Sequence, residues 1–121
     1  MKVIILSAGQ GSRLLPLTED RPKCLLEIGG STLLGLQLKA LQDGGASDVV
    51  IVTGFRTAAV EAAAAAACAP GFAVRTLFNP FYNVADNLAS CWMARAEMAG
   101  PFLLLNGDTL FEPAILGRLL A

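Results

Sequence analysis

A loop that contains two glycines follows the first apolar run of the chain. Val3–Ala8 is almost continuously apolar, and Gly9-Gln10-Gly11-Ser12-Arg13 comes directly after it. Two glycines let the backbone turn tightly and bring N–H groups close to an anion. Ser12 adds a hydroxyl donor, and Arg13 adds a planar cation that suits phosphate oxygens. The loop is therefore a candidate phosphate site, although a plain strand-to-loop turn also needs glycine.

This loop matches neither of two familiar phosphate-binding motifs. The dinucleotide fingerprint needs a third glycine where Leu14 stands. A Walker A loop needs Gly-Lys followed by Ser or Thr, which occurs nowhere in the chain. Any phosphate site here must be of another kind.

Two charged side chains elsewhere are candidates for the same anion. Pro22 keeps the residue before it out of helical angles, so Lys23 is expected in an extended segment. Its ammonium can serve phosphate as a point charge, or it is an ordinary surface lysine. Asp108 follows the apolar run Leu103–Leu105 and Asn106-Gly107. A carboxylate just past a buried strand suits Mg2+, which also recruits substrate phosphates, but it can equally cap a turn or a helix.

Three further residues carry weaker signals. Asn87 is either a helix cap or a site residue, and Ser90 follows it by three positions. Trp92 is expected in the core rather than as a platform for a ligand.

The elements that must hold these residues alternate between short apolar runs and helical stretches. Strands are predicted over Val3–Ala8, Val49–Thr53, Val74–Phe78 and Phe102–Leu105. Helices are predicted over Leu33–Gln42 with Ser31 as N-cap, over Arg56–Ala69, over Leu88–Met98 with Asp86 or Asn87 as cap, and from about Pro113. The chain shows no internal repeat and no linker.

Strands that alternate with helices predict an α/β fold with a mainly parallel sheet and right-handed crossovers. Ligands of such sheets bind beyond the carboxyl ends of the strands, at a topological switch point. If the fourth strand returns beside the first, the loops 7–13 and 106–108 flank one crevice.

Composition limits the class of protein. Charged residues make up 16% of the 121 residues, against a usual ~25%, and 55% are hydrophobic even without the 12 glycines. This excludes a disordered chain. Because a small globule buries only about two-thirds of its surface, some apolar surface should stay exposed, for a partner or because the domain is unfinished. No segment approaches the length of a membrane span, which argues against a membrane partner.

The absence of histidine removes several chemistries. Without His the chain can form no Ser-His-Asp triad, no Cys-His pair and no His metal site. Cys24, Cys68 and Cys91 form no CxxC motif, and their odd number fits reduced, mostly buried thiols in a cytoplasmic protein. A net charge of −1 without a basic stripe argues against nucleic acid as a partner.

Several of these segments, taken together, resemble a known signature. Leu6–Leu14, Pro16–Thr18, Pro22–Gly30 and Asn106–Asp108 are similar to the sugar-phosphate nucleotidyltransferase superfamily in sequence and in spacing. Asn79-Pro80-Phe81-Tyr82, followed by Asn87 and Ser90, resembles the branch that contains the bacterial choline-phosphate cytidylyltransferases.

The resemblance implies a Rossmann-like three-layer α/β/α fold and Mg2+-dependent transfer of a nucleotidyl group from an NTP to a small phosphate monoester, with release of pyrophosphate. CTP and phosphocholine are the leading pair, and a sugar-1-phosphate nucleotidyltransferase or a non-catalytic nucleotide-binding module are the alternatives. The residues it assigns to the nucleotide are Leu6, Ala8, Gly9, Gln10, Gly11 and Ser12, with Asn87 near the base or the acceptor. Arg13 would hold the triphosphate, Lys23 the reacting phosphate, and Asp108 the Mg2+.

The family continues beyond the point where this sequence stops, with more strands and a second metal-binding carboxylate. Residues 1–121 are therefore expected to be the N-terminal, NTP-binding half of the domain, truncated after its fourth strand. A homo-oligomer is left open by the sequence.

Overall fold

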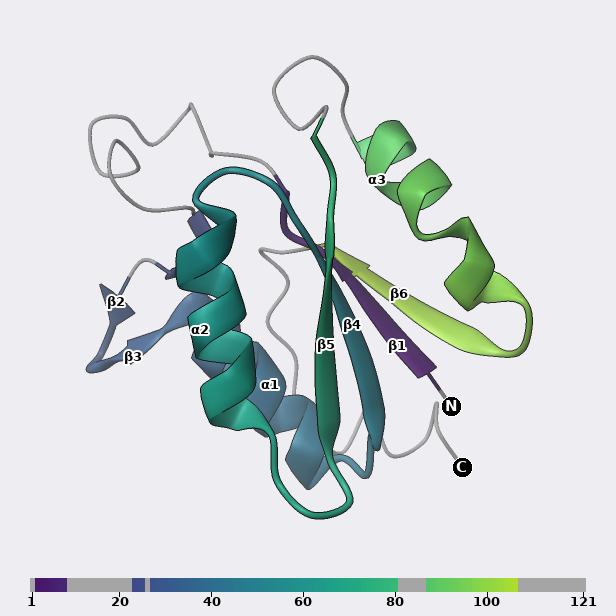
Figure 1. Ribbon diagram of the computed structural model, residues 1–121. Helices are drawn as coiled ribbons and strands as arrows, with labels where there is room; N and C mark the ends of the chain where they lie inside the picture. The colour runs from purple at the N-terminus through teal and green to yellow at the C-terminus, as the bar shows by residue number, and fades with distance from the viewer. Residues whose placement is uncertain (1, 9–22, 26, 81–86, 107–121) are drawn as a thin grey trace.

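The computed structural model describes residues 2–8, 23–25, 27–80 and 87–106. Its centre is a four-stranded sheet in the order β5-β4-β1-β6, with all neighbouring strands parallel (Figure 1). The strands are β1 (Lys2–Leu6), β4 (Asp48–Thr53), β5 (Ala73–Phe78) and β6 (Phe102–Asn106). The parallel sheet predicted from the sequence is thus confirmed, and β6 lies beside β1.

The strand β1 is buried on both faces of the sheet. Val3, Ile4 and Ile5 are fully buried, and their neighbours Val49 and Ile51 on β4 are as well. The register sets Val3 against Val49 on one side and Leu103 on the other. Each such side chain contributes about 1.5–3 kcal/mol on burial, which explains why nearly continuous apolar runs form these strands.

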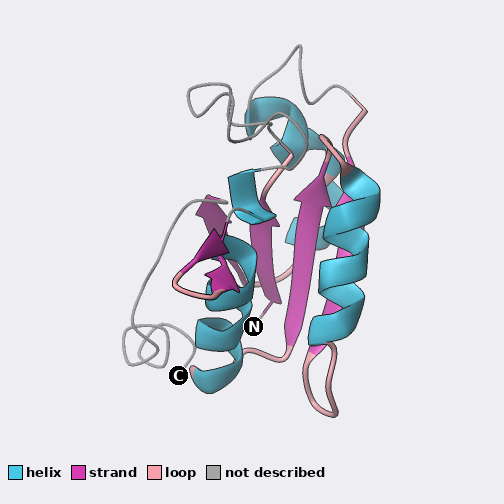
Figure 2. Ribbon diagram, turned by 90° about the vertical axis from the view of Figure 1, so that its left-hand side faces the viewer, coloured by secondary structure: helices cyan, strands magenta, loops and turns pink. Residues whose placement is uncertain are grey.

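Helices cover both faces of the sheet. Helix α1 (Leu33–Asp43) and helix α2 (Thr57–Ala67) lie on one side, and α3 (Asn87–Met93) lies on the other (Figure 1). The second view shows helices packed lengthwise along the strands (Figure 2). This is the three-layer α/β/α arrangement that the resemblance implied.

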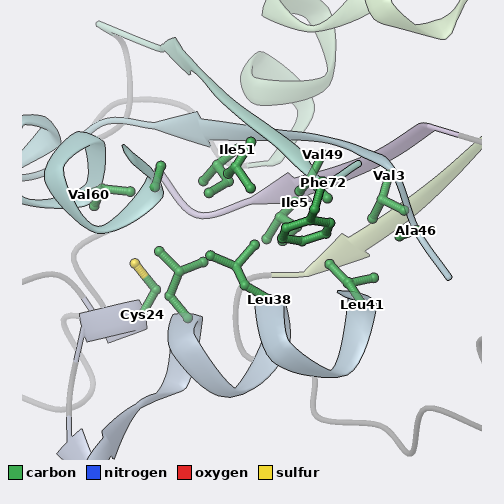
Figure 3. Close-up of a cluster of buried hydrophobic side chains, with 13 residues drawn as sticks. Val3, Ile5, Cys24, Leu38, Leu41, Ala46, Val49, Ile51, Val60 and Phe72 are labelled. Atoms are coloured by element: carbon green, nitrogen blue, oxygen red, sulfur yellow. The ribbon is translucent and has the colours of Figure 1, made fainter. Parts of the chain in front are cut away.

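The larger core lies between β1, β4, α1 and α2. From α1, Leu38 and Leu41 point toward the strands (Figure 3). The N-cap of α1 is Thr32 rather than the predicted Ser31, because the Thr32 hydroxyl accepts a hydrogen bond from the Gly35 N–H at 2.9 Å. Gly44 ends the helix as predicted.

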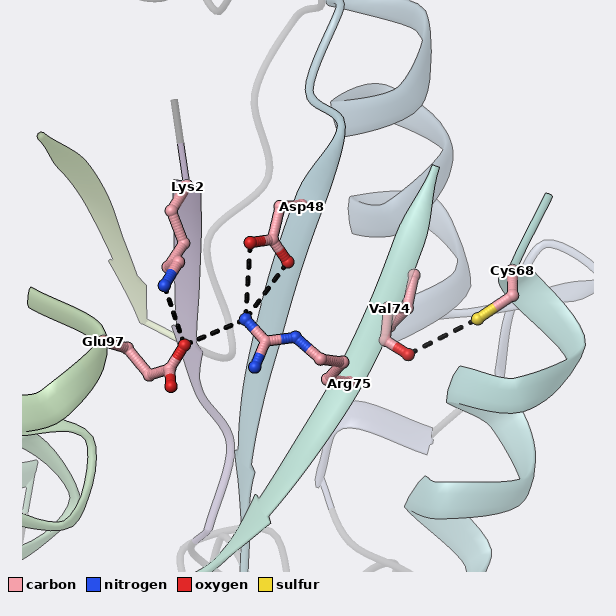
Figure 4. Close-up of polar contacts among 6 residues, drawn as sticks. All are labelled: Lys2, Asp48, Cys68, Val74, Arg75 and Glu97. Atoms are coloured by element: carbon pink, nitrogen blue, oxygen red, sulfur yellow. Dashed lines mark hydrogen bonds and ion pairs between the residues drawn. The ribbon is translucent and has the colours of Figure 1, made fainter. Parts of the chain in front are cut away.

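Helix α2 is shorter at both ends than the predicted 56–69. Arg56 has left-handed backbone angles (φ 54°) and so precedes the helix. Cys68 is extended, and its thiol donates to the Val74 carbonyl at 3.4 Å, which draws the chain toward β5 (Figure 4). Ala69 then pairs with Phe72 in a turn.

The helix predicted over 88–98 is divided in two. Helix α3 ends at Met93, and a 3-10 helix, η3, covers Arg95–Met98. Ala94 between them is fully buried against the sheet, and the Glu97 N–H donates to its carbonyl at 2.9 Å. The tighter turn brings the Glu97 side chain to the start of β1, where it binds Lys2.

A small hairpin was not predicted. Strands β2 (Glu27–Ile28) and β3 (Ser31–Thr32) pair antiparallel after the 3-10 helix η2 (Lys23–Leu25). Gly29 and Gly30 both have positive φ, which the tight two-residue hairpin turn requires. Strands of two residues are too short to leave a periodic pattern.

Trp92 is exposed, contrary to the core position predicted for it. Its neighbour Cys91 packs against the sheet, so a helix turns Trp92 outward, where 63% of it is accessible and Arg95 stacks on its ring at 4.1 Å. Phe78, Phe102 and Leu104 are also exposed, which confirms that apolar surface remains. Of the cysteines only Cys24 is buried. Among the described residues no helix is long and apolar enough to span a membrane.

An ionic cluster ties the amino ends of the strands together. The Glu97 carboxylate accepts from Lys2 Nζ at 2.8 Å and from Arg75 Nη2 at 2.9 Å, and Arg75 also binds Asp48 at 3.2 Å (Figure 4). The hydrogen bond from Lys2, and then that from Arg75, holds the pKa of Glu97 below its usual range. The cluster links η3 to β1, β4 and β5.

The Glu97→Gln variant should unfold at lower urea concentration than the unsubstituted protein at pH 7, by about 1 kcal/mol or less because the cluster is partly exposed. Because the pKa of Glu97 is lowered in the folded state, its carboxylate stabilises the folded protein at pH values above the ordinary Glu pKa of about 4.3. This stabilisation is lost as the pH falls through the pKa of Glu97 in the folded protein. The difference should therefore shrink toward pH 3. Asp43→Asn is the control, because Asp43 forms only an exposed pair with Lys39 at 3.9 Å, and this substitution should change the stability little. If Glu97→Gln lost the same stability at pH 7 and at pH 3, the Glu97 charge would not stabilise the cluster.

Candidate functional site

The carboxyl ends of the four strands form one edge of the sheet. In the register, Leu6 of β1 lies opposite Val52 of β4 and Asn106 of β6. The chain leaves β1 toward α1 on one face and reaches β6 from α3 on the other, so the topology switches between these two strands. This is where ligands of open α/β sheets bind, and the fourth strand does lie beside the first, which was the condition for both loops to flank one crevice.

The residues predicted for the site fall partly within the described chain. Leu6 and Ala8 are buried at the end of β1, and Asn87 begins α3. Lys23 begins the 3-10 helix η2, so the extended segment predicted for it is wrong. The other predicted site residues lie outside the described residues: Gly9, Gln10, Gly11, Ser12, Arg13 and Asp108. Both predicted loops therefore start from described strand ends that are direct neighbours, Leu6 and Asn106.

Backbone hydrogen bonds hold the chain where it leaves β1. The Ser7 N–H donates to the Val52 carbonyl at 3.0 Å, which extends the ladder past the end of the strand. The Phe55 N–H donates to the Ala8 carbonyl at 2.9 Å. The loop after β4 thus fixes the backbone of Ala8, the residue that precedes the glycine-rich loop.

A buried side-chain pair holds the end of β5 to α3. The Asn79 amide donates to the Ser90 hydroxyl at 3.1 Å, and both residues are buried. The Asn79 N–H also donates to the Thr53 carbonyl at 2.7 Å. Both residues belong to the motif noted in the sequence, but their partnership was not predicted. The pair fixes the start of α3, and with it the backbone of Asn87.

Gln37 was not among the residues predicted from the sequence. This residue is fully buried on α1, and its Nε2 donates to the backbone carbonyl of Asn106 at 3.1 Å. The signal that could have found it is a polar residue within the apolar stripe of Leu34, Leu38 and Leu41. A side chain of α1 thus reaches the end of β6.

Cys24 follows Lys23 and is not a reactive thiol. Burial raises the pKa of Cys24 to about 11. The thiolate is therefore scarce at neutral pH, and Cys24 serves as a core residue beneath α1.

Acidic, His and Cys side chains do not gather into a group of three that could hold a metal in the part of the chain that the structure describes.

The fold and the switch-point edge define a Rossmann-like α/β domain of the kind that binds nucleotides. The chain matches the family model of the MobA-like NTP transferase domain over residues 3–121 and belongs to that family. The resemblance to nucleotidyltransferases drawn from the sequence motifs is thereby confirmed.

Individual relatives point the same way. CMP-5'-(3-aminopropyl)phosphonate synthase of Streptomyces rubellomurinus is 36% identical over 121 residues, which are 100% of this chain and 19% of that protein. N-acetylmuramate alpha-1-phosphate uridylyltransferase of Neisseria meningitidis is 33% identical over 93% of this chain and 48% of its own length. The solved CTP:phosphocholine cytidylyltransferase of Streptococcus pneumoniae superposes with a TM-score of 0.79 at 29% identity, covering 93% of this chain and 49% of that one. The chain thus spans no more than about half the length of these relatives.

Ser90→Ala should destabilise the protein by about 1–3 kcal/mol, because it removes the buried acceptor of the Asn79 amide. Urea unfolding of Ser90→Ala, Asn79→Ala and the double variant measures the coupling between the two side chains, which should be of the same order. Ser47→Ala, at an exposed serine, is the control. Strictly additive losses would show that the pair does not hold α3.

Proposed function

We propose that the chain is the NTP-binding part of a nucleotidyltransferase, which moves a nucleotidyl group from an NTP to a small phosphate monoester and releases pyrophosphate. The observation that carries this proposal is the pairing of β1 with β6 in a member of the NTP transferase family. Because of this pairing, the end of β1, which precedes the glycine-rich loop, lies beside the end of β6, which precedes Asp108 in the sequence. On this proposal, residues 1–121 form the N-terminal half of the catalytic domain.

The proposed roles follow the charge of the substrates. Backbone N–H groups of Gly9 and Gly11, with the Ser12 hydroxyl, bind the nucleotide beside Leu6 and Ala8. Gln10 belongs to the same loop. Arg13 holds the triphosphate and Lys23 the reacting phosphate, and Asn87 contributes from the start of α3. Fixed donors and cations of this kind act by positioning and by stabilising the charge on the leaving pyrophosphate.

Mg2+ is proposed as the cofactor, with Asp108 as its protein ligand. A single carboxylate fits Mg2+ because this ion keeps several waters and takes further ligands from substrate phosphates. When bound, the ion would reduce the electrostatic repulsion between the two anionic substrates.

The acceptor needs no base from the protein. A phosphate monoester has its second pKa near ~6 and is already an anionic nucleophile at neutral pH. A chain without histidine is therefore no obstacle to this reaction.

CTP with phosphocholine is the proposed substrate pair. It is supported by the Asn79–Tyr82 motif and by two relatives whose names carry CMP or CTP. A sugar-1-phosphate acceptor is the second candidate, because the uridylyltransferase relative covers nearly as much of the chain.

Pyrophosphate release tests the proposal. Each of the four NTPs is combined with phosphocholine, with simple phosphomonoesters and with sugar 1-phosphates, in the presence of Mg2+. Release should be greatest with CTP and phosphocholine, and UTP with a sugar 1-phosphate would select the second candidate. Measurable NTP binding without release from any pair would identify a nucleotide-binding module instead.

Arg13→Ala should weaken NTP binding by on the order of 1.5–3 kcal/mol, because it removes a charge-assisted contact to phosphate. Isothermal titration with CTP measures the loss, and circular dichroism checks that the variant is folded. Arg95→Ala, which removes a cation already stacked on Trp92, is the matched control. Equal affinities for Arg13→Ala and the unsubstituted protein would remove Arg13 from the site.

Asp108→Asn keeps the shape of the side chain and removes its charge. In the unsubstituted protein we expect Mg2+ affinity to rise sharply when NTP is present, and Asp108→Asn should abolish this gain with little change in melting temperature. Calorimetric Mg2+ titrations with and without CTP measure this gain in Mg2+ affinity for the unsubstituted protein and for Asp108→Asn. A capping residue would behave in the opposite way, with a lower melting temperature and an unchanged gain.

A further inference from the structure

Two threonine hydroxyls close the turn between β4 and α2. Thr53 is the last residue of β4 and is fully buried, and Thr57 is the first residue of α2. Their Oγ1 atoms lie 2.5 Å apart, whereas the Leu77 carbonyl lies 3.5 Å from the Thr53 hydroxyl. The Thr57 hydroxyl donates to Glu61 Oε1 at 3.3 Å, so its oxygen is left to accept from Thr53. The two side chains thus tie together the ends of the turn 54–56.

The backbone of this turn includes a strained residue. Gly54 at the start of the turn is buried, and Arg56 at its end has left-handed backbone angles, with φ at 54°. A residue that carries a side chain keeps such angles only where the surrounding structure imposes them. The turn therefore needs contacts that hold its ends in place, and the pair of Thr53 and Thr57 supplies one.

The same turn contacts the chain where it leaves β1. The strands β1 and β4 end at one edge of the sheet, and the chain passes from there over to α2 (Figure 1). Phe55, in the middle of the turn, donates its N–H to the Ala8 carbonyl at 2.9 Å. Ala8 is buried and lies two residues beyond the last residue of β1. The position of the turn therefore bears directly on the backbone of Ala8.

We propose that Thr53 is a positioning residue for the backbone of Ala8. Its hydroxyl closes the turn, the closed turn directs the Phe55 N–H, and this N–H holds the Ala8 carbonyl at the edge where ligands of such sheets bind. The part of the proposal that concerns the nucleotide rests on the proposed function, in which Ala8 lies beside the NTP. The part that concerns the turn and Ala8 does not.

Two substitutions of Thr53 separate its hydroxyl from its packing. Thr53→Val keeps the branched shape and removes the hydroxyl, whereas Thr53→Ser keeps the hydroxyl and removes a methyl group from a buried position. Thr76→Val is the matched control, because Thr76 lies in the neighbouring strand β5, opposite Ile51 and outside the turn. Circular dichroism checks that all three variants are folded.

Hydrogen exchange at the Phe55 amide tests the turn without any ligand. In Thr53→Val this amide should exchange at least about fivefold faster, the factor that one hydrogen bond of ordinary strength represents. The amides of Ile4 and Ile51, inside β1 and β4, should stay as protected as in the unsubstituted protein. Thr53→Ser should exchange more slowly at Phe55 than Thr53→Val, although it packs less well, and Thr76→Val should match the unsubstituted protein.

Isothermal titration with CTP in the presence of Mg2+ tests the part that concerns the nucleotide. Thr53→Val should weaken CTP binding by about three- to tenfold, as expected of a residue that acts through its neighbours. Thr53→Ser should recover most of this affinity, and Thr76→Val should bind CTP as the unsubstituted protein does.

The outcomes separate this proposal from the proposed function. If the unsubstituted protein binds none of the four NTPs, the proposed function fails together with the nucleotide part, and exchange at Phe55 decides whether Thr53 positions Ala8. If Phe55 exchanges equally in Thr53→Val and Thr76→Val, or faster in Thr53→Ser than in Thr53→Val, the side chain acts by packing alone and the positioning role is overturned. Faster exchange in Thr53→Val with unchanged CTP affinity would overturn the link to the nucleotide.

Discussion

The whole arrangement depends on the burial of β1 between β4 and β6. Val3, Ile4 and Ile5 lose all contact with water, and their side chains face helices on both sides of the sheet. A strand buried in this way cannot shift its register by one residue without exchanging its two faces, so the ends of its neighbours are fixed with it. The direct pairing of Leu6 with Asn106 follows from this constraint.

Hydrogen bonds from a neighbouring loop and from two helices also hold the chain at the ends of β1, β5 and β6. Phe55 binds the backbone of Ala8, Ser90 binds the side chain of Asn79, and Gln37 binds the carbonyl of Asn106. Hydrogen bonds of this kind contribute about 1 kcal/mol each to stability, too little to determine the fold. Their effect is geometric: they define where the loops begin, and sites of this type depend on rigid supports.

The strands and the parallel sheet could be predicted because burial on both faces leaves continuous apolar runs, as in Val49–Thr53. What could not be predicted depends on contacts between distant residues. The break at Ala94 goes with the contact between Lys2 and Glu97, which are 95 positions apart, and the partnership of Gln37 with Asn106 crosses 69 positions. Trp92 was misplaced because hydrophobicity alone does not say which side of a short helix faces the sheet. Of the candidate site, the sequence predicted the edge of the sheet but not the buried hydrogen bonds that support it, and the two loops stay predictions because they lie outside the described residues.

Charge is distributed so that the two ends of the sheet differ. At the amino ends, Lys2 and Arg75 are matched by Glu97 and Asp48, and these four formal charges cancel. In the sequence, the segment from Gly9 to Lys23 that follows β1 holds three basic residues and two acidic ones. A chain with a net charge of −1 has no long-range attraction for an NTP. On the proposed function, the attraction therefore has to come from cations close to the phosphates, and the basic residues that follow β1 in the sequence are the candidates for this role.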